Sequence, residues 1–94
     1  MSGVLLLVTQ TACVIPADVR AAVFPIAGTV VFLQNGVYNT KEILDKNGIR
    51  LSAGVECFTL GEDADARNVS SPFKRIDYSW LVDAIEASEK TITL

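Results

Sequence analysis

The chain has 94 residues, of which half are hydrophobic and 20% are charged, and it contains no histidine. A length of this order accommodates one hydrophobic core, so we expect a single domain over residues 1–94. Eight basic residues are scattered among eleven acidic ones, for a net charge of −3, which argues against direct nucleic-acid binding.

The chain has two cysteines, Cys13 and Cys57. Because they lie far apart in the sequence and histidine is absent, one chain cannot build a zinc site, a Cys-x-x-Cys pair or a Cys-His nucleophile pair. We therefore expect neither a metal nor a cofactor.

The apolar content is high for a small monomer and indicates a subunit interface. The N-terminal run is too short and too poor in basic residues for a signal peptide, and Pro25, Gly28 and Gln34 interrupt the uncharged segment 21–40. We expect a cytoplasmic chain that does not enter a membrane and whose cysteines are reduced.

The first predicted elements are a strand over Val4–Val8 and a helix that begins at Pro16. Continuous apolar runs of this kind are typical of buried parallel strands. Proline suits the first position of a helix, and Asp18 complements its positive end. The predicted apolar face of this helix comprises Val19, Ala22 and Val23, with Arg20 on the outside.

A second strand is predicted over Thr29–Leu33, followed by one helix from Asn35 to Lys46. The turn Asn35-Gly36 resembles a phosphate cradle only weakly, because such cradles carry several glycines, and a tight structural turn is favoured. The residues expected to face inward are Val37, Ile43 and Leu44, and Asn47-Gly48 ends the helix.

Two further strands, Val55–Leu60 and Phe73–Ile76, flank a short polar helix over Glu62–Asn68. The acidic run at the start of this helix favours a solvated helix N-terminus over a cation site. Cys57 lies inside the predicted strand, where cysteine usually packs as a small hydrophobic residue.

The last helix has Asp77 as its predicted N-cap, and Thr91–Leu94 is expected to form an edge strand. Residues at helical spacing on the predicted apolar stripe are Trp80, Leu81, Ala84, Ile85 and Ser88. Tyr78 lies off this stripe and is the better candidate for a subunit interface; Trp80 is a second one.

Strands and helices thus alternate along the whole chain. This order predicts an α/β fold: a three-layer α/β/α domain around a mainly parallel sheet of four or five strands. In such sheets ligands bind at the carboxyl ends of the strands, so the loops that follow the predicted strands are the places to expect chemistry.

Cys13 lies in the first of these loops, ahead of a predicted helix. One interpretation is a reactive thiol that carries a persulfide, with the helix N-terminus favouring the thiolate. The other is a small apolar residue packed beneath the loop. The second is favoured, because there is no histidine and the nearest basic residue in sequence is Arg20.

Three segments in matching order and spacing resemble the DsrH/TusB family, over a stretch from about Val30 to the C-terminus. They are Leu33–Val37; Leu60–Asp63 with Ala66 and Arg67; and Ile76–Tyr78 with Leu81 and Val82. The resemblance implies the DsrE-like superfamily of sulfur-relay proteins. It implies a subunit, itself non-catalytic, that assembles with DsrE/TusD-like and DsrF/TusC-like chains and supports persulfide transfer, towards tRNA wobble-uridine 2-thiolation or in sulfur oxidation.

The sequence also departs from the family pattern. Some family members carry a cysteine in the first helix; that position falls near Arg20 here, so Cys13 does not inherit its role. Three further positions differ: Asn35 stands where the family has an acidic residue, Asn68 where it often has a glycine, and Leu94 where it tends to have an aromatic residue. Two alternatives therefore stay open. One is a sulfurtransferase acting through Cys13, and the other is a self-associating chain that binds a small ligand at the strand ends.

Overall fold

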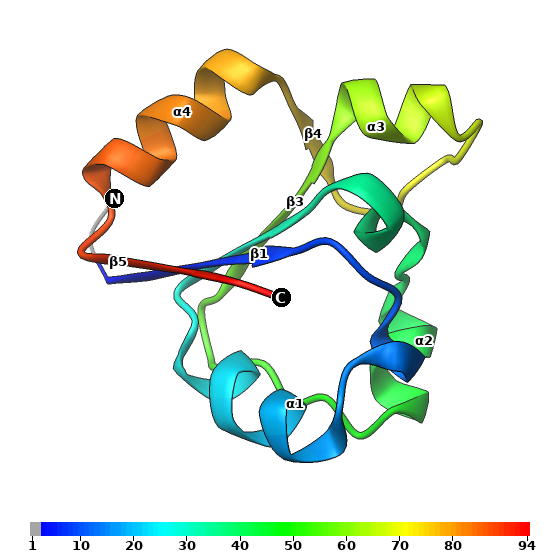
Figure 1. Ribbon diagram of the computed structural model, residues 1–94, viewed down its shortest axis with the longest axis vertical. Helices are drawn as coiled ribbons and strands as arrows, with labels where there is room; N and C mark the ends of the chain where they lie inside the picture. Colours follow the sequence, from blue (N-terminus) through cyan, green and yellow to red (C-terminus); the bar gives the residue numbers. More distant parts are fainter. Residues whose placement is uncertain (1–2) are drawn as a thin grey trace.

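The computed structural model describes residues 3–94 and contains a five-stranded parallel sheet between two layers of helices (Figure 1). The predicted α/β class and parallel sheet are confirmed. The elements in chain order are β1 (Val4–Val8), η1 (Ala12–Val14), α1 (Ala17–Val23), η2 (Phe24–Ile26), β2 (Thr29–Phe32), η3 (Gln34–Tyr38), α2 (Lys41–Lys46), β3 (Glu56–Leu60), α3 (Gly61–Ala66), β4 (Lys74–Ile76), α4 (Tyr78–Ala87) and β5 (Lys90–Thr93), where η denotes a 3₁₀ helix.

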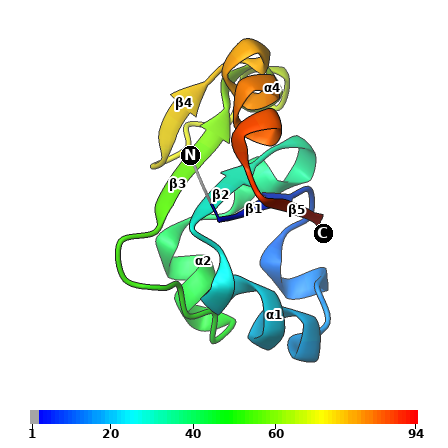
Figure 2. The ribbon, with the colours of Figure 1, turned by 90° about the vertical axis from the view of Figure 1, so that its left-hand side faces the viewer.

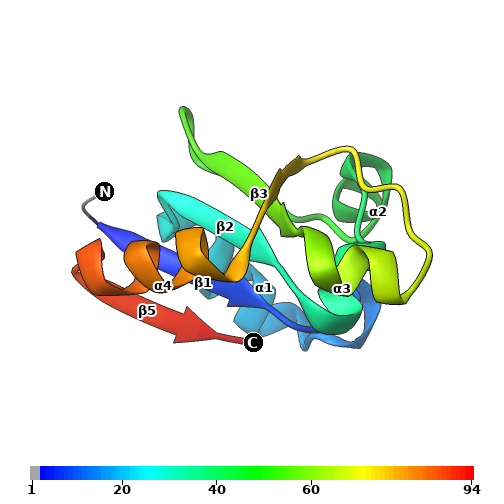
Figure 3. The same ribbon diagram turned by 90° about the horizontal axis from the view of Figure 1, so that it is seen from above.

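The strand order is β4-β3-β2-β1-β5, so β4 and β5 form opposite edges of the sheet (Figure 2). Helices α1 and α2 lie on one side of the sheet and α3 and α4 on the other (Figures 1 and 3). The interior strand β1 is therefore covered on both faces, which is why its sequence is continuously apolar and does not alternate.

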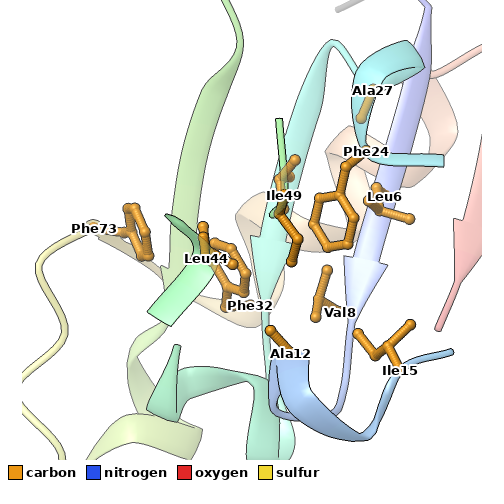
Figure 4. Close-up of a cluster of buried hydrophobic side chains, with 11 residues drawn as sticks. Leu6, Val8, Ala12, Ile15, Phe24, Ala27, Phe32, Leu44, Ile49 and Phe73 are labelled. Carbon is orange, nitrogen blue, oxygen red and sulfur yellow. The ribbon is translucent and has the colours of Figure 1, made fainter. Parts of the chain in front are cut away.

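Side chains of the central strands divide between two hydrophobic clusters. On the α1 and α2 side, Leu6 and Val8 pack with Phe24 and Phe32 (Figure 4). On the other side, one cluster joins the sheet to α4 and comprises Leu5, Leu7, Val31, Phe58, Leu60, Ile76, Leu81 and Ala84. Alternate residues of β1 thus supply both cores, as the two-residue period of a strand requires.

The prediction of one helix from Asn35 to Lys46 is wrong, because the structure divides this segment into η3 and α2. The break falls at Asn39 and Thr40. The Asn39 side chain is fully buried and bonds to the backbone, and the Thr40 hydroxyl caps α2 by accepting a hydrogen bond from the Ile43 amide at 3.2 Å. Side-chain bonds to the backbone therefore replace helical ones here.

Helix α1 differs from its predicted amphipathic pattern. Val19 and Val23 are half-buried as expected, but Ala22 is exposed and Arg20 is not on the outside. The Arg20 guanidinium donates from Nη1 to the Ala12 carbonyl oxygen at 3.0 Å. The arginine is thus part of the packing beneath the first loop, which a count of apolar residues does not reveal.

Helix α4 agrees closely with its prediction. Asp77 is the N-cap, and its carboxylate accepts a hydrogen bond from the Trp80 amide at 2.8 Å. Leu81 and Ala84 are buried against the sheet, but Ile85, expected on the same stripe, is 40% exposed. Helix α4 therefore carries more apolar surface on its outer side than predicted.

Candidate functional site at the carboxyl edge

Because all strands are parallel, their carboxyl ends lie along one edge of the sheet (Figure 3). The loop Thr9–Cys13, the 3₁₀ helix η3 and the start of α3 follow three of these ends directly. The C-terminal residue is tied to the same edge, because the Thr9 amide and hydroxyl both donate to the Leu94 carbonyl oxygen. This carboxyl edge is the position where open α/β sheets bind their ligands.

Asn39 holds two of these segments together. Its Oδ1 accepts a hydrogen bond from the Ala12 amide at 2.9 Å, and its Nδ2 donates to the carbonyl oxygens of Gln10 and Gly36, each at 3.0 Å. The side chain is completely buried, and its bonds to Ala12 and Gly36 are shielded from water, while the bond to Gln10 is partly buried. The loop that carries Cys13 is therefore fixed to η3 by one side chain.

Gly36 allows η3 to pack directly on the end of β1. A Cβ atom at this position would lie 1.9 Å from the Val8 carbonyl oxygen, far inside contact distance. The turn is also tightened by Gln34, whose φ of 51° is a left-handed conformation that few non-glycine residues adopt. The Asn35-Gly36 turn is thus used for close backbone packing, as the sequence favoured.

Polar contacts connect η3 to α3. The Asp63 carboxylate accepts a hydrogen bond from the Gln34 amide at 2.6 Å, and Arg67 Nε donates to the Asn35 side-chain oxygen at 3.0 Å. These contacts bring together two of the segments that carry the family resemblance, and the third begins at the end of β4, where Asp77 and Trp80 line an open hollow of about 420 Å³.

Cys13 is exposed, so the interpretation that it packs beneath the loop is wrong. It lies in η1, and its sulfur is 3.5 Å from the Thr11 hydroxyl oxygen. The nearby Arg20 guanidinium is bound to the Ala12 carbonyl and, at 2.9 Å, to the Asn47 side-chain oxygen. Ala12, beneath Cys13, is buried, which leaves the thiol on the outer side of the turn.

Cys57 is half-buried in β3 and packs against the first hydrophobic cluster, as predicted for a cysteine in a strand. Burial raises the pKa of its thiol, and the positive charge of Lys41 opposes this effect. The two cysteines therefore differ in environment: Cys13 faces solvent on a loop, whereas Cys57 is a protected thiol in the sheet.

The acidic run at the start of α3 has partners within the protein. Asp63 binds the Gln34 amide, and Asp65 forms a two-bond ion pair with Arg75, at 3.0 and 2.8 Å. Hydrogen bonding to Arg75 lowers the pKa of the Asp65 carboxyl. These carboxylates thus serve as a helix start and an edge contact, the interpretation that the sequence favoured.

Helix α4 presents an apolar stripe to solvent. Tyr78, Val82 and Ile85 are 52%, 51% and 40% exposed, and their spacing of four and three residues places them on one face of the helix. Trp80 is only half-buried and packs on Phe58, with ring centroids 4.6 Å apart. Of the two aromatic residues, Tyr78 thus lies on the free face and Trp80 mainly in the packing.

Among the helices formed by residues 3–94, none combines the length and the apolar character needed to cross a membrane.

The structure thus defines a small parallel α/β sandwich with an exposed cysteine on its first strand-end loop and a glycine turn packed at its carboxyl edge. A comparison with family models identifies the particular family. The model described as "DsrH like protein" matches residues 22–91, so the chain belongs to the DsrH-like family. No curated protein matches the chain. Membership makes the chain a protein of the sulfur-relay type, and members of this family work within sulfur-relay complexes.

The sequence did not predict the roles of two residues at this edge. Asn39 and Arg20 act through bonds to the backbone of other segments, and such bonds have no periodic signature. One signal was present: Thr40 is a good N-cap and would have marked a helix start within the segment predicted as continuous.

Proposed function

We propose that this chain is a non-catalytic subunit of a cytoplasmic sulfur-relay complex and that it binds DsrE/TusD-like and DsrF/TusC-like subunits through helix α4. The observation that carries the proposal is the exposed stripe of Tyr78, Val82 and Ile85 on a chain of the DsrH-like family. Three large apolar side chains on one helix face resemble the core of a protein interface more than a solvated surface.

The charged residue beside the stripe indicates what kind of surface the partner presents. Glu86 is exposed on the same helix, one turn after Val82, and flanks the stripe on one side; exposed Asp83 lies farther round the helix on that side. A complementary surface combines apolar side chains with basic groups at its rim, because opposite charges at a rim favour the correct partner. Such a contact supports persulfide transfer on another subunit, in tRNA wobble-uridine 2-thiolation or in sulfur oxidation.

The test is to co-express the tagged chain with the DsrE-like and DsrF-like proteins of its source and to determine the mass of the intact complex. We expect a defined complex that contains all three chains. The variant Val82→Asp places a charge in the centre of the stripe and should lower recovery of the companions at least about tenfold, since desolvating a charge in an apolar interface is costly.

Ala87→Asp is the matched control. It introduces the same charge on the same helix, at an exposed position roughly opposite the stripe. We expect this variant to bind its companions normally. If both variants bind equally well, or if the unaltered chain captures neither companion and forms only homo-oligomers, the proposed role of α4 is wrong.

Cys13 supports a second candidate function, a persulfide carrier, because its thiol is exposed on the first strand-end loop. A persulfide donor should then add one sulfur atom to the peptide that contains Cys13, and Cys13→Ser should abolish transfer to an acceptor. Sulfur found only on the companion subunits would reject this function and leave the non-catalytic role intact.

A further inference from the structure

A hollow of about 530 Å³ lies beside β3, on the side of the sheet covered by α2. It flanks the sheet and is separate from the loops of the carboxyl edge. Helix α2 has only six residues and β4 only three, so neither extends far enough to cover this flank. Phe73 closes one wall by stacking on Phe32, with ring centroids 4.8 Å apart, and Leu44 lies next to both rings (Figure 4).

Most of the residues that line the hollow are apolar, and about half of its exposed lining is polar. Leu44, Ile49 and Phe73 are buried in the core, and Leu51 and Val55 remain partly exposed to the hollow. Partly exposed aliphatic side chains around a concave surface gain free energy when a ligand removes them from water. The volume lies within the range of small-molecule sites, roughly 300 to 1,000 Å³.

The charged side chains that line the hollow carry a net positive charge. Lys41 and Lys74 line it, against one carboxylate, that of Asp45. Within residues 3–94, the ion pair between Arg75 and Asp65 is the one salt bridge found, so the Lys41 ammonium is free of an acidic partner. The positive charge of Lys41 acts on the Cys57 thiol, whose pKa it lowers, and Cys57 also lines the hollow.

We propose that this hollow binds a small amphipathic carboxylate, such as a medium-chain fatty acid, with its apolar body against Leu51 and Phe73 and its carboxylate near Lys41. Cys57 contributes contact area without a competing negative charge, because burial raises the pKa of its thiol and keeps it protonated at neutral pH. The proposed site is independent of the sulfur relay and does not need the companion subunits.

The experiment is a titration of the full chain with octanoate, followed by amide chemical shifts, with 1-octanol as the uncharged analogue. We expect saturable shifts confined to residues around the hollow and about tenfold weaker binding of octanol. Lys41→Gln should weaken octanoate about fivefold and leave octanol unchanged. Lys46→Gln, on the same helix but outside the hollow, is the matched control and should change neither.

Alkylation gives a second measurement. Bound octanoate should slow the reaction of Cys57 with N-ethylmaleimide and leave that of Cys13 unchanged. The proposal is overturned if octanoate causes no saturable shifts at the hollow, if octanol binds equally well, or if Lys46→Gln acts like Lys41→Gln. It is also overturned if companion subunits protect Cys57 and abolish octanoate binding, since the hollow is then a protein interface.

Discussion

At the scale of single residues, the carboxyl edge depends on side chains that bind the backbone of other segments. Asn39 makes three such bonds and Arg20 Nη1 makes one, to the carbonyl of Ala12. Both residues act on the loop that carries Cys13. The geometry of this loop is therefore determined by polar groups outside it.

Replacing Asn39 with alanine should destabilise the protein by about 2 kcal/mol, because the buried Ala12 amide loses its acceptor and the Gln10 carbonyl loses a donor, whereas the Gly36 carbonyl keeps its bond from the backbone amide of residue 39. Urea unfolding measures this loss. Asn35→Ala is the control, since Asn35 is exposed and its side chain, among residues 3–94, bonds to Arg67 alone; its cost should stay under about 1 kcal/mol. Equal costs for the two variants would show that Asn39 does not fasten the loop.

The two thiols should react at different rates. Cys57 is half-buried and burial raises its pKa, so its thiolate fraction is small at neutral pH and its alkylation should be slower than that of exposed Cys13. The Lys41 charge favours the thiolate, so Lys41→Gln should raise the pKa further and slow Cys57 at every pH between about 7 and 9.

Peptide mass spectrometry after timed alkylation follows both sites in one sample. Lys46→Gln is the control, because Lys46 does not contribute to the pKa of the Cys57 thiol. Faster alkylation of Cys57 in the Lys41→Gln variant would contradict the assigned direction of the charge effect.

At the scale of elements, the strands were the most predictable part of the chain. The predicted bounds match those of β1 and agree with the other strands to within one residue at each end. For β1 and β2 the reason is burial on both faces, which imposes a continuous apolar sequence; the edge strands β4 and β5 are mostly exposed and lack this signal. The division between η3 and α2 was not predicted, since it depends on the burial of Asn39 against distant segments. Sequence periodicity reflects local helix preference, whereas the break between η3 and α2 is caused by tertiary contacts.

Gly36→Ala should be among the most destabilising substitutions in the chain. The added Cβ would lie 1.9 Å from the Val8 carbonyl oxygen, so η3 has to move away from β1, at a cost of roughly 3 kcal/mol. Gly28→Ala is the matched control, because its Cβ would meet no atom closer than 3.8 Å and its φ is not positive. Thermal unfolding should therefore separate the two variants clearly; similar melting temperatures would refute the close-packing argument.

At the scale of the whole molecule, the fold was predictable but its free surfaces were not. The alternation of elements indicates a covered parallel sheet, whereas the hollow beside β3 results from how far α2 and β4 extend in space. The stripe on α4 was predicted only for Tyr78, because Ile85 was assigned to the core. Exposure depends on how a helix is rotated on its sheet, and periodicity alone fixes that rotation only approximately.

Sheet order also predicts how stability is distributed. Strands β1, β2 and β3 are paired on both sides, whereas β5 is an edge strand. The residue that follows it, Leu94, points its amide and carbonyl groups toward β1 and the loop after it. By alternation, the Thr91 and Thr93 amides point away from the sheet. In hydrogen exchange of the isolated chain, these two amides should exchange fastest within β5, and those of Val30 and Val31 in β2 should be the most protected. Slow exchange at Thr91 and Thr93 in the isolated chain would mean that a second copy of the chain pairs with β5. That result would contradict the free edge inferred from the strand order.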